Sequence, residues 1–142
     1  MLLSKVIDFV KENKAKNRRE AFGFEGDTLK MYVTWAFSFN YLFVVFNNNE
    51  ITGVGVAYPL KTPYNGDKFT LFIFNDIVPV ADEHKHELCI MDLITLNEEA
   101  TKTMVNDFKK RYPNWENQTK WMIRSDEAKE FKNKHLTLLN KI

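Results

Sequence analysis

Few residues of this chain have types and spacings that could perform chemistry, and the densest group is the stretch DEHKHE at residues 82–87. In an extended strand, His84 and His86 would lie on the same side and could present two nitrogen ligands to a metal ion. No third ligand follows at a recognisable spacing. We therefore expect a polar loop that leads into a strand, and no metal site.

The apolar run Leu88–Leu96 contains two further candidates. Cys89 is the one cysteine of the chain, and its apolar neighbours predict a buried thiol in place of a nucleophile. A single cysteine cannot form an internal disulfide, which fits a reducing compartment. Asp92 interrupts the run and would place a carboxylate on a central strand, where it could serve as a catalytic base. The structural alternative is an Asp that bonds neighbouring backbone or points to a solvated face.

Composition and missing motifs exclude several classes of protein. The chain has no GxSxG, HExxH, Walker or GxGxxG motif, so nucleotide binding by those routes is excluded. The net charge of +1 gives no field that would attract a nucleic acid. No apolar run approaches the ~20 residues of a membrane span. Charged residues interrupt the apolar positions near residue 1, whereas a secretory signal has an unbroken apolar stretch. We expect a cytoplasmic protein without a membrane or nucleic-acid partner.

The elements that must position these residues form an α+β pattern within one domain, residues 1–142. A change from a two-residue to a helical period at Thr95 marks the end of a strand and the start of a helix. The predicted elements are, in chain order, a helix over 4–17 capped by Ser4, a segment Thr28–Phe39 whose periodicity fits helix or strand, strands at Tyr41–Phe46, Ile51–Tyr58, Phe69–Phe74 and Leu88–Leu96, a helix over Asn97–Arg111, a strand over Lys120–Arg124, and a helix over Asp126–Asn140 capped by Ser125.

Two strands separated by Asn47–Glu50 indicate a β-hairpin, and the second carries two glycines. Gly53 and Gly55 are two residues apart, so they lie on one face of the strand. Glycine inside a strand marks a bulge or a close approach of another segment. We therefore predict that Val54 and Val56 face the core while another segment packs closely over the two glycines.

The order of elements and three stretches of sequence resemble the GNAT acyltransferase fold. The run YLFVVFNNNEITGVGVAYPL is similar to the second and third strands of that fold, CIMDLITLNEEATKTMVNDFKKRYP to its fourth strand and following helix, and TKWMIRSDEAKEFKNKHL to its fifth strand and helix. The resemblance covers residues 28–139. It implies a mixed, mainly antiparallel central sheet flanked by helices, and it implies a helix for the ambiguous segment Thr28–Phe39.

In active GNAT proteins, the fourth strand diverges from the fifth, and a glycine-rich turn at the helix start binds the pyrophosphate of acyl-coenzyme A through free backbone amides. The resemblance implies that an active enzyme would use Asp92 or Glu98 as the base. It would bind acetyl-CoA or another acyl-CoA through Leu93, Ile94, Thr95, Asn97, Thr101, Lys102 and Arg124. The matching turn, Thr95–Lys102, has no glycine, and it carries two carboxylates where the phosphates would lie. Each carboxylate would repel the ligand by on the order of 1 kcal/mol.

Two functions follow. The first is a GNAT-like scaffold with a degenerate acyl-CoA loop, no cofactor, and a surface that binds a protein partner. Short proteins of this kind resemble GNAT-like proteins of tailed bacteriophages, some of them virion-associated, so the host cytoplasm or the virion is the expected location. The alternative is an active CoA-dependent N-acyltransferase that transfers an acetyl group to an amine.

Overall fold

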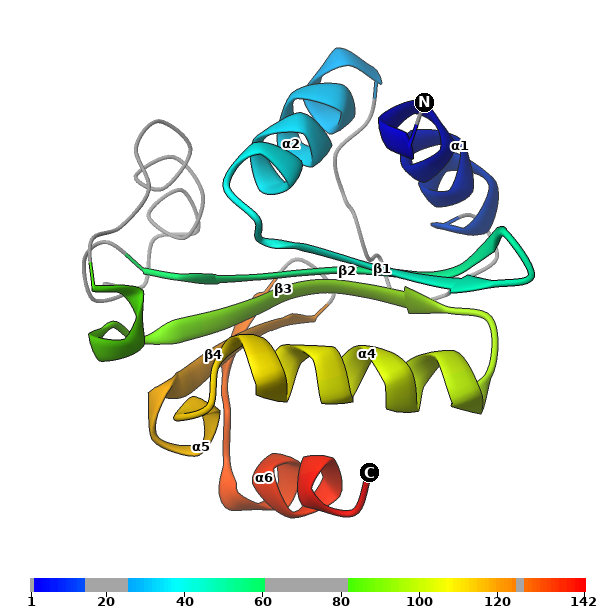
Figure 1. Ribbon diagram of the computed structural model, residues 1–142. Helices are drawn as coiled ribbons and strands as arrows, with labels where there is room; N and C mark the ends of the chain where they lie inside the picture. Colours follow the sequence, from blue (N-terminus) through cyan, green and yellow to red (C-terminus); the bar gives the residue numbers. More distant parts are fainter. Residues whose placement is uncertain (1, 15–25, 61–81, 125–126) are drawn as a thin grey trace.

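The computed structural model describes residues 2–14, 26–60, 82–124 and 127–142. They form an α+β fold in which a mixed sheet carries helices on both faces (Figure 1). The helices α1 (Leu2–Lys14) and α2 (Gly26–Ser38) cover one face, and α4 (Glu98–Arg111) and α6 (Asn133–Asn140) cover the other. The remaining elements are β1 (Leu42–Asn47), β2 (Glu50–Pro59), the 3-10 helix η2 (Glu83–Lys85), β3 (Leu88–Thr95), α5 (Trp115–Gln118), β4 (Thr119–Arg124) and β5 (Glu127–Glu130).

The sheet has the strand order β1-β2-β3-β4-β5. Neighbouring strands are antiparallel except for β3 and β4, which are parallel. Parallel neighbours need a crossover connection, and α4 with α5 supplies it. The interior strand β2 is buried from Gly53 to Pro59, as expected for a strand covered by helices on both faces.

The two helices before the sheet differ from their predicted limits. α1 begins at Leu2, so Ser4 lies inside the helix and the prediction of Ser4 as its cap is wrong. Residues 15–17, predicted as its end, lie outside the described residues. The ambiguous segment Thr28–Phe39 is helical, since α2 buries Leu29, Tyr32, Val33 and Ala36 at helical spacing.

The predicted hairpin between β1 and β2 is confirmed. Asn48 and Asn49 have φ of 51° and 68°, which is the left-handed region that asparagine tolerates. Two consecutive residues of this kind match the twist of antiparallel strands. The expected strand Phe69–Phe74 lies outside the described residues.

The helix over Asn97–Arg111 is confirmed as α4, with Asn97 as its N-cap, and the glycines of β2 set its distance from the sheet. A Cβ added at Gly55 would lie 2.6 Å from Sδ of Met104, and one at Gly53 would lie 3.0 Å from Cε of the same residue. Met104 is therefore in contact with bare backbone. Val54 and Val56 are buried in the core on the other side, as predicted.

The predicted helix over Asp126–Asn140 is wrong at its start. Residues Glu127–Glu130 form β5, which pairs antiparallel with β4, and α6 begins at Asn133. The residues EAKE favour helix when isolated, but pairing with the edge of β4 satisfies their backbone groups and overrides that propensity. Ser125, the predicted cap, lies outside the described residues.

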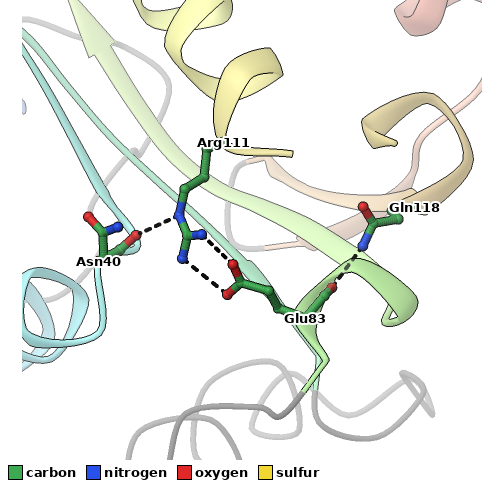
Figure 2. Close-up of polar contacts among 4 residues, drawn as sticks. All are labelled: Asn40, Glu83, Arg111 and Gln118. Carbon is green, nitrogen blue, oxygen red and sulfur yellow. Dashed lines mark hydrogen bonds and ion pairs between the residues drawn. The ribbon is translucent and has the colours of Figure 1, made fainter. Parts of the chain in front are cut away.

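An ion pair joins segments that are distant in sequence (Figure 2). The guanidinium of Arg111, at the end of α4, donates to both carboxylate oxygens of Glu83 in η2, with 3.0 Å between Nη2 and Oε2. Arg111 also donates from Nε to the carbonyl oxygen of Asn40 at 3.4 Å. Gln118 donates from Nε2 to the carbonyl oxygens of Glu83 and His86 at 2.8 and 2.9 Å. These contacts fix η2 between the α2–β1 turn, α4 and α5.

Within the described residues, no helix combines the length and the apolar character needed to cross a membrane.

The close approach of α4 to the sheet predicts the effect of Gly55→Val. We expect the valine to lower the free energy of unfolding by about 1 to 3 kcal/mol, because its branched side chain must displace Met104. Urea unfolding measures this change. The double variant Gly55→Val with Met104→Ala should be less destabilised than the sum of the two single changes. An unchanged urea midpoint for Gly55→Val would contradict the close contact.

The ion pair between Arg111 and Glu83 predicts a cost for Arg111→Lys. Lysine keeps the charge but cannot donate to both carboxylate oxygens at once, so we expect thermal unfolding to show a loss of about 1 kcal/mol. Lys110→Arg, an exchange at the exposed neighbouring position, is the control and should leave stability unchanged. Equal stability of the two variants would show that the bidentate geometry contributes nothing.

Candidate functional site

The predicted catalytic base, Asp92, is buried within the sheet. It lies in β3 beside a register shift between β2 and β3, and its exposed fraction is 8%. The hydroxyl of Tyr32, from α2, donates to Oδ2 of Asp92 at 2.5 Å. The burial of Asp92 excludes a solvated face, and a side chain of another element is one of its partners. The carboxylate is thus a fixed link between the sheet and α2.

Aromatic side chains surround this link on the α2 face of the sheet. Trp35 lies at the centre, with ring centroids 5.8 Å from Tyr32, 5.6 Å from Tyr41 and 5.0 Å from Tyr58. The Tyr58 hydroxyl is buried and has no hydrogen-bond partner among the described residues. Burial raises the pKa of Tyr32 and of Tyr58 well above the ordinary tyrosine value, and the Asp92 carboxylate raises both further. Both phenols therefore stay protonated at neutral pH.

Cys89 precedes Asp92 in β3 and is fully buried. Burial raises the pKa of its thiol above the ordinary range, and the nearby Asp92 carboxylate adds to the shift. A nucleophilic cysteine needs the opposite change, toward the thiolate. The prediction of a buried structural thiol is confirmed.

The start of α4, where the GNAT resemblance would place the phosphates of acyl-CoA, is capped from within the chain. The side chain of Asn97 accepts a hydrogen bond from the backbone N–H of Ala100 at 2.8 Å. The Thr95 and Thr101 hydroxyls are 2.7 Å apart and bonded to each other. Glu98 and Glu99 are exposed in the first turn. One of the amides that could bind an anion is therefore occupied, and two negative charges flank the others.

The pairing of β3 with β4 covers only the beginning of both strands. In the part of the chain that the structure describes, Leu88–Ile90 pair with residues of β4 and the rest of β3 does not. Leu93 lies in this second half and is 41% exposed. Beside it, between the sheet, α4 and α6, a mainly apolar cavity of about 80 Å³ is lined by Ile90, Leu93, Val105 and Leu139, among others. A small apolar group would fit there.

The remaining candidates divide into those that the fold brings together and those that it separates. Thr95, Asn97 and Thr101 meet at the start of α4. Lys102 is exposed on the same helix, and Ile94 is buried in the core under α1 and α2. Arg124 ends β4, and its side chain lies outside the described part. Asp92 and Glu98, the two proposed bases, lie in different places. Asp92 is buried beneath α2 and also borders the apolar cavity beside Leu93, whereas Glu98 is exposed at the start of α4.

The two histidines do not lie on a strand. His84 belongs to η2 and packs its ring against Tyr112 with centroids 6.2 Å apart, while His86 donates from Nδ1 to the carbonyl oxygen of Leu60 at 3.0 Å. The prediction of a polar loop that leads into a strand is confirmed, because η2 turns the chain just before β3 begins at Leu88. Among the described residues, no group of three or more His, Cys, Asp and Glu side chains could hold a metal ion.

Sequence reasoning missed Tyr32 as the partner of Asp92. The available signal was the helical spacing of Leu29, Tyr32, Val33 and Ala36, which places Tyr32 on the buried face of α2. Most buried tyrosines bond an acceptor through the hydroxyl, and Asp92 is the carboxylate that interrupts an apolar strand. Nothing in the sequence fixes which strand lies under α2, so the pair itself could not be named.

Comparison of the chain with known proteins gave no relative. No protein-family model matches it, and searches of the curated proteins and of the solved structures found no match either.

The buried phenols and thiol predict a loss of stability in alkaline solution. Their folded-state pKa values are raised, so above pH 9 to 10, the ordinary values for thiol and phenol, the unfolded chain releases protons that the folded chain retains. The contribution of these groups to the free energy of unfolding is therefore fully present below this pH range, and it is lost as pH rises through the range.

Tyr32→Phe tests the contribution of one phenol. At neutral pH, the variant should lose about 1 to 3 kcal/mol, because Asp92 loses a buried donor. Above pH 10, its stability should fall less steeply than that of the wild type, by about 1.4 kcal/mol per pH unit, since one proton fewer is released on unfolding. Urea unfolding at pH 7, 9, 10 and 11 measures both effects. Parallel curves above pH 10 would contradict the raised pKa of Tyr32.

Proposed function

We propose that this chain is a non-catalytic scaffold with a GNAT-like fold that acts by binding a protein partner. The observation that carries the proposal is the start of α4, where Asn97 caps the helix and the exposed Glu98 and Glu99 flank it. A cofactor with a pyrophosphate needs free amides and a positive or neutral surface at this position. Here the Asn97 side chain accepts the hydrogen bond of the Ala100 amide, and Glu98 and Glu99 add two negative charges.

The burial of Asp92 supports the same proposal. A general base must reach the proton that it removes, directly or through one water molecule. Asp92 is held by Tyr32 beneath α2, and the thiol of Cys89 is buried beside it. Both groups contribute to the packed core of the α2 face, so the acid on the central strand is explained as a structural hydrogen-bond acceptor.

An acyltransferase is the second candidate, and one observation favours it. Because β3 pairs with β4 only at Leu88–Ile90, the described residues leave the edge of β3 at Leu93–Thr95 open to an added strand, which is how a pantetheine arm could bind. On this alternative, Glu98 would be the accessible base and Lys102 would contact the phosphates. A virion or host-cytoplasm location, as for the phage proteins that this chain resembles, belongs to the scaffold proposal.

Calorimetric titration with acetyl-CoA distinguishes the two functions. The scaffold proposal predicts no binding tighter than ~100 μM, a limit that corresponds to about 5.5 kcal/mol. Titrations of wild type and Lys102→Ala at two salt concentrations complete the test, with Lys110→Ala as a control for an exposed lysine at the far end of the same helix. Tight wild-type binding that Lys102→Ala weakens, and that salt weakens further, would replace the scaffold by the acyltransferase.

A further inference from the structure

We propose that two copies of this chain associate through the outer edge of β1 to form one continuous sheet. β1 is the first strand in the sheet order, and in the described residues its only strand partner is β2. An edge strand presents a row of backbone N–H and C=O groups that can pair with another strand. This inference goes beyond the scaffold proposal and does not depend on it.

The two edges of the sheet differ in their protection against such pairing. Proteins commonly block an exposed edge with charged residues or proline. β5, at one edge, has the sequence EAKE, in which three of four residues are charged. β1, at the other edge, has the sequence LFVVFN, and the flanking residues from Tyr41 to Asn49 include no charge and no proline. The β1 edge therefore lacks the features that would keep a second strand away.

The side chains of β1 are complementary to themselves in an antiparallel pair centred on Val44. Leu42 and Val44 pack on the α1 and α2 face, while Phe43 and Val45 pack on the α4 face. A twofold axis perpendicular to the sheet keeps each face on its own side, so residues of equal parity meet. The pairs are then Leu42 with Phe46, Phe43 with Val45, and Val44 with its own copy. Every pair is apolar, and no like charges meet.

Exposed apolar side chains are present on α2 and on β1. α2 precedes β1 in the chain and contacts it. It exposes 71% of Met31 and 47% of Phe37, and Phe46 on β1 is 48% exposed. A six-residue strand pair is small against the ~800 Å² that each partner contributes to a typical specific interface. In the proposed pair, the exposed side chain of Phe46 would add apolar area beyond the backbone pairing.

A second copy is the occupant that these observations favour. β1 has no charged side chain that would select a different strand. In the antiparallel pair of two β1 strands, every pair of facing residues is apolar. The resulting sheet would have β1 strands at its centre, and its two outer edges would both be the charged β5 strand. Pairing at β1 thus removes the unprotected edge from the assembly and ends it at protected ones.

Sedimentation velocity over roughly two decades of concentration around ~50 μM tests the association. We expect a monomer–dimer equilibrium for the wild type. Phe46→Lys should raise the dimer dissociation constant at least tenfold, because it places a charge in the pairing edge. Leu138→Lys, at a 61% exposed position on α6, should leave it unchanged. A wild-type protein that is monomeric at every concentration would overturn the proposal.

Cysteine cross-linking tests the register. Val44→Cys should form a disulfide-linked dimer under mild oxidation, since the twofold axis brings its two copies into direct opposition, within disulfide distance. Phe46→Cys should not, because its two copies are about 14 Å apart in this register. The native Cys89 is fully buried and does not interfere. Equal cross-linking of the two variants, or a dimer that Phe46→Lys does not weaken, would show that the interface lies elsewhere.

Discussion

The position of α4 is constrained by the contact between its Met104 side chain and the backbone of Gly53 and Gly55 in β2. It sets how near α4 lies to β2, and through the short β3–α4 connection it sets where the helix begins. Asn97 caps that helix at the end of β3. The position of the candidate site therefore depends on two missing Cβ atoms, and any larger side chain there would move the helix start.

On the opposite face of the sheet, the hydrogen bond between Tyr32 and Asp92 fixes the position of α2. It replaces the solvation that a carboxylate loses inside a sheet, and it joins α2 to the central strand β3. The stacked and edge-on rings around Trp35 exclude water from this region. A carboxylate held in this way stabilises one arrangement of α2 and the sheet.

The functional proposal rests on how these two faces divide the polar groups. The face with α1 and α2 contains Asp92, Cys89 and the tyrosines at positions 32, 41 and 58, all buried. The face with α4 contains the partly open β3 strand, an apolar cavity and a helix start with two exposed acids. The two predicted bases are therefore separated: Asp92 is buried beneath α2, and Glu98 is exposed at the start of α4. Exposed apolar side chains on α2 and β1 are consistent with a protein that works through contacts with other chains, including a copy of itself.

The sequence by itself determined the local features of this protein. The Asn48-Asn49 turn, the change of period at Thr95 and the Asn97 cap follow from neighbouring residues, so the hairpin, β3 and α4 were predictable. Tertiary structure decided the features that depend on residues far apart in the chain. Glu127–Glu130 has helical propensity, yet it is a strand because β4 offers an edge, and Thr28–Phe39 is a helix because one of its faces packs on the sheet. The partner of Asp92 was undetermined for the same reason: Tyr32 is sixty residues away, and a contact over that separation exists only once the sheet and α2 have packed together.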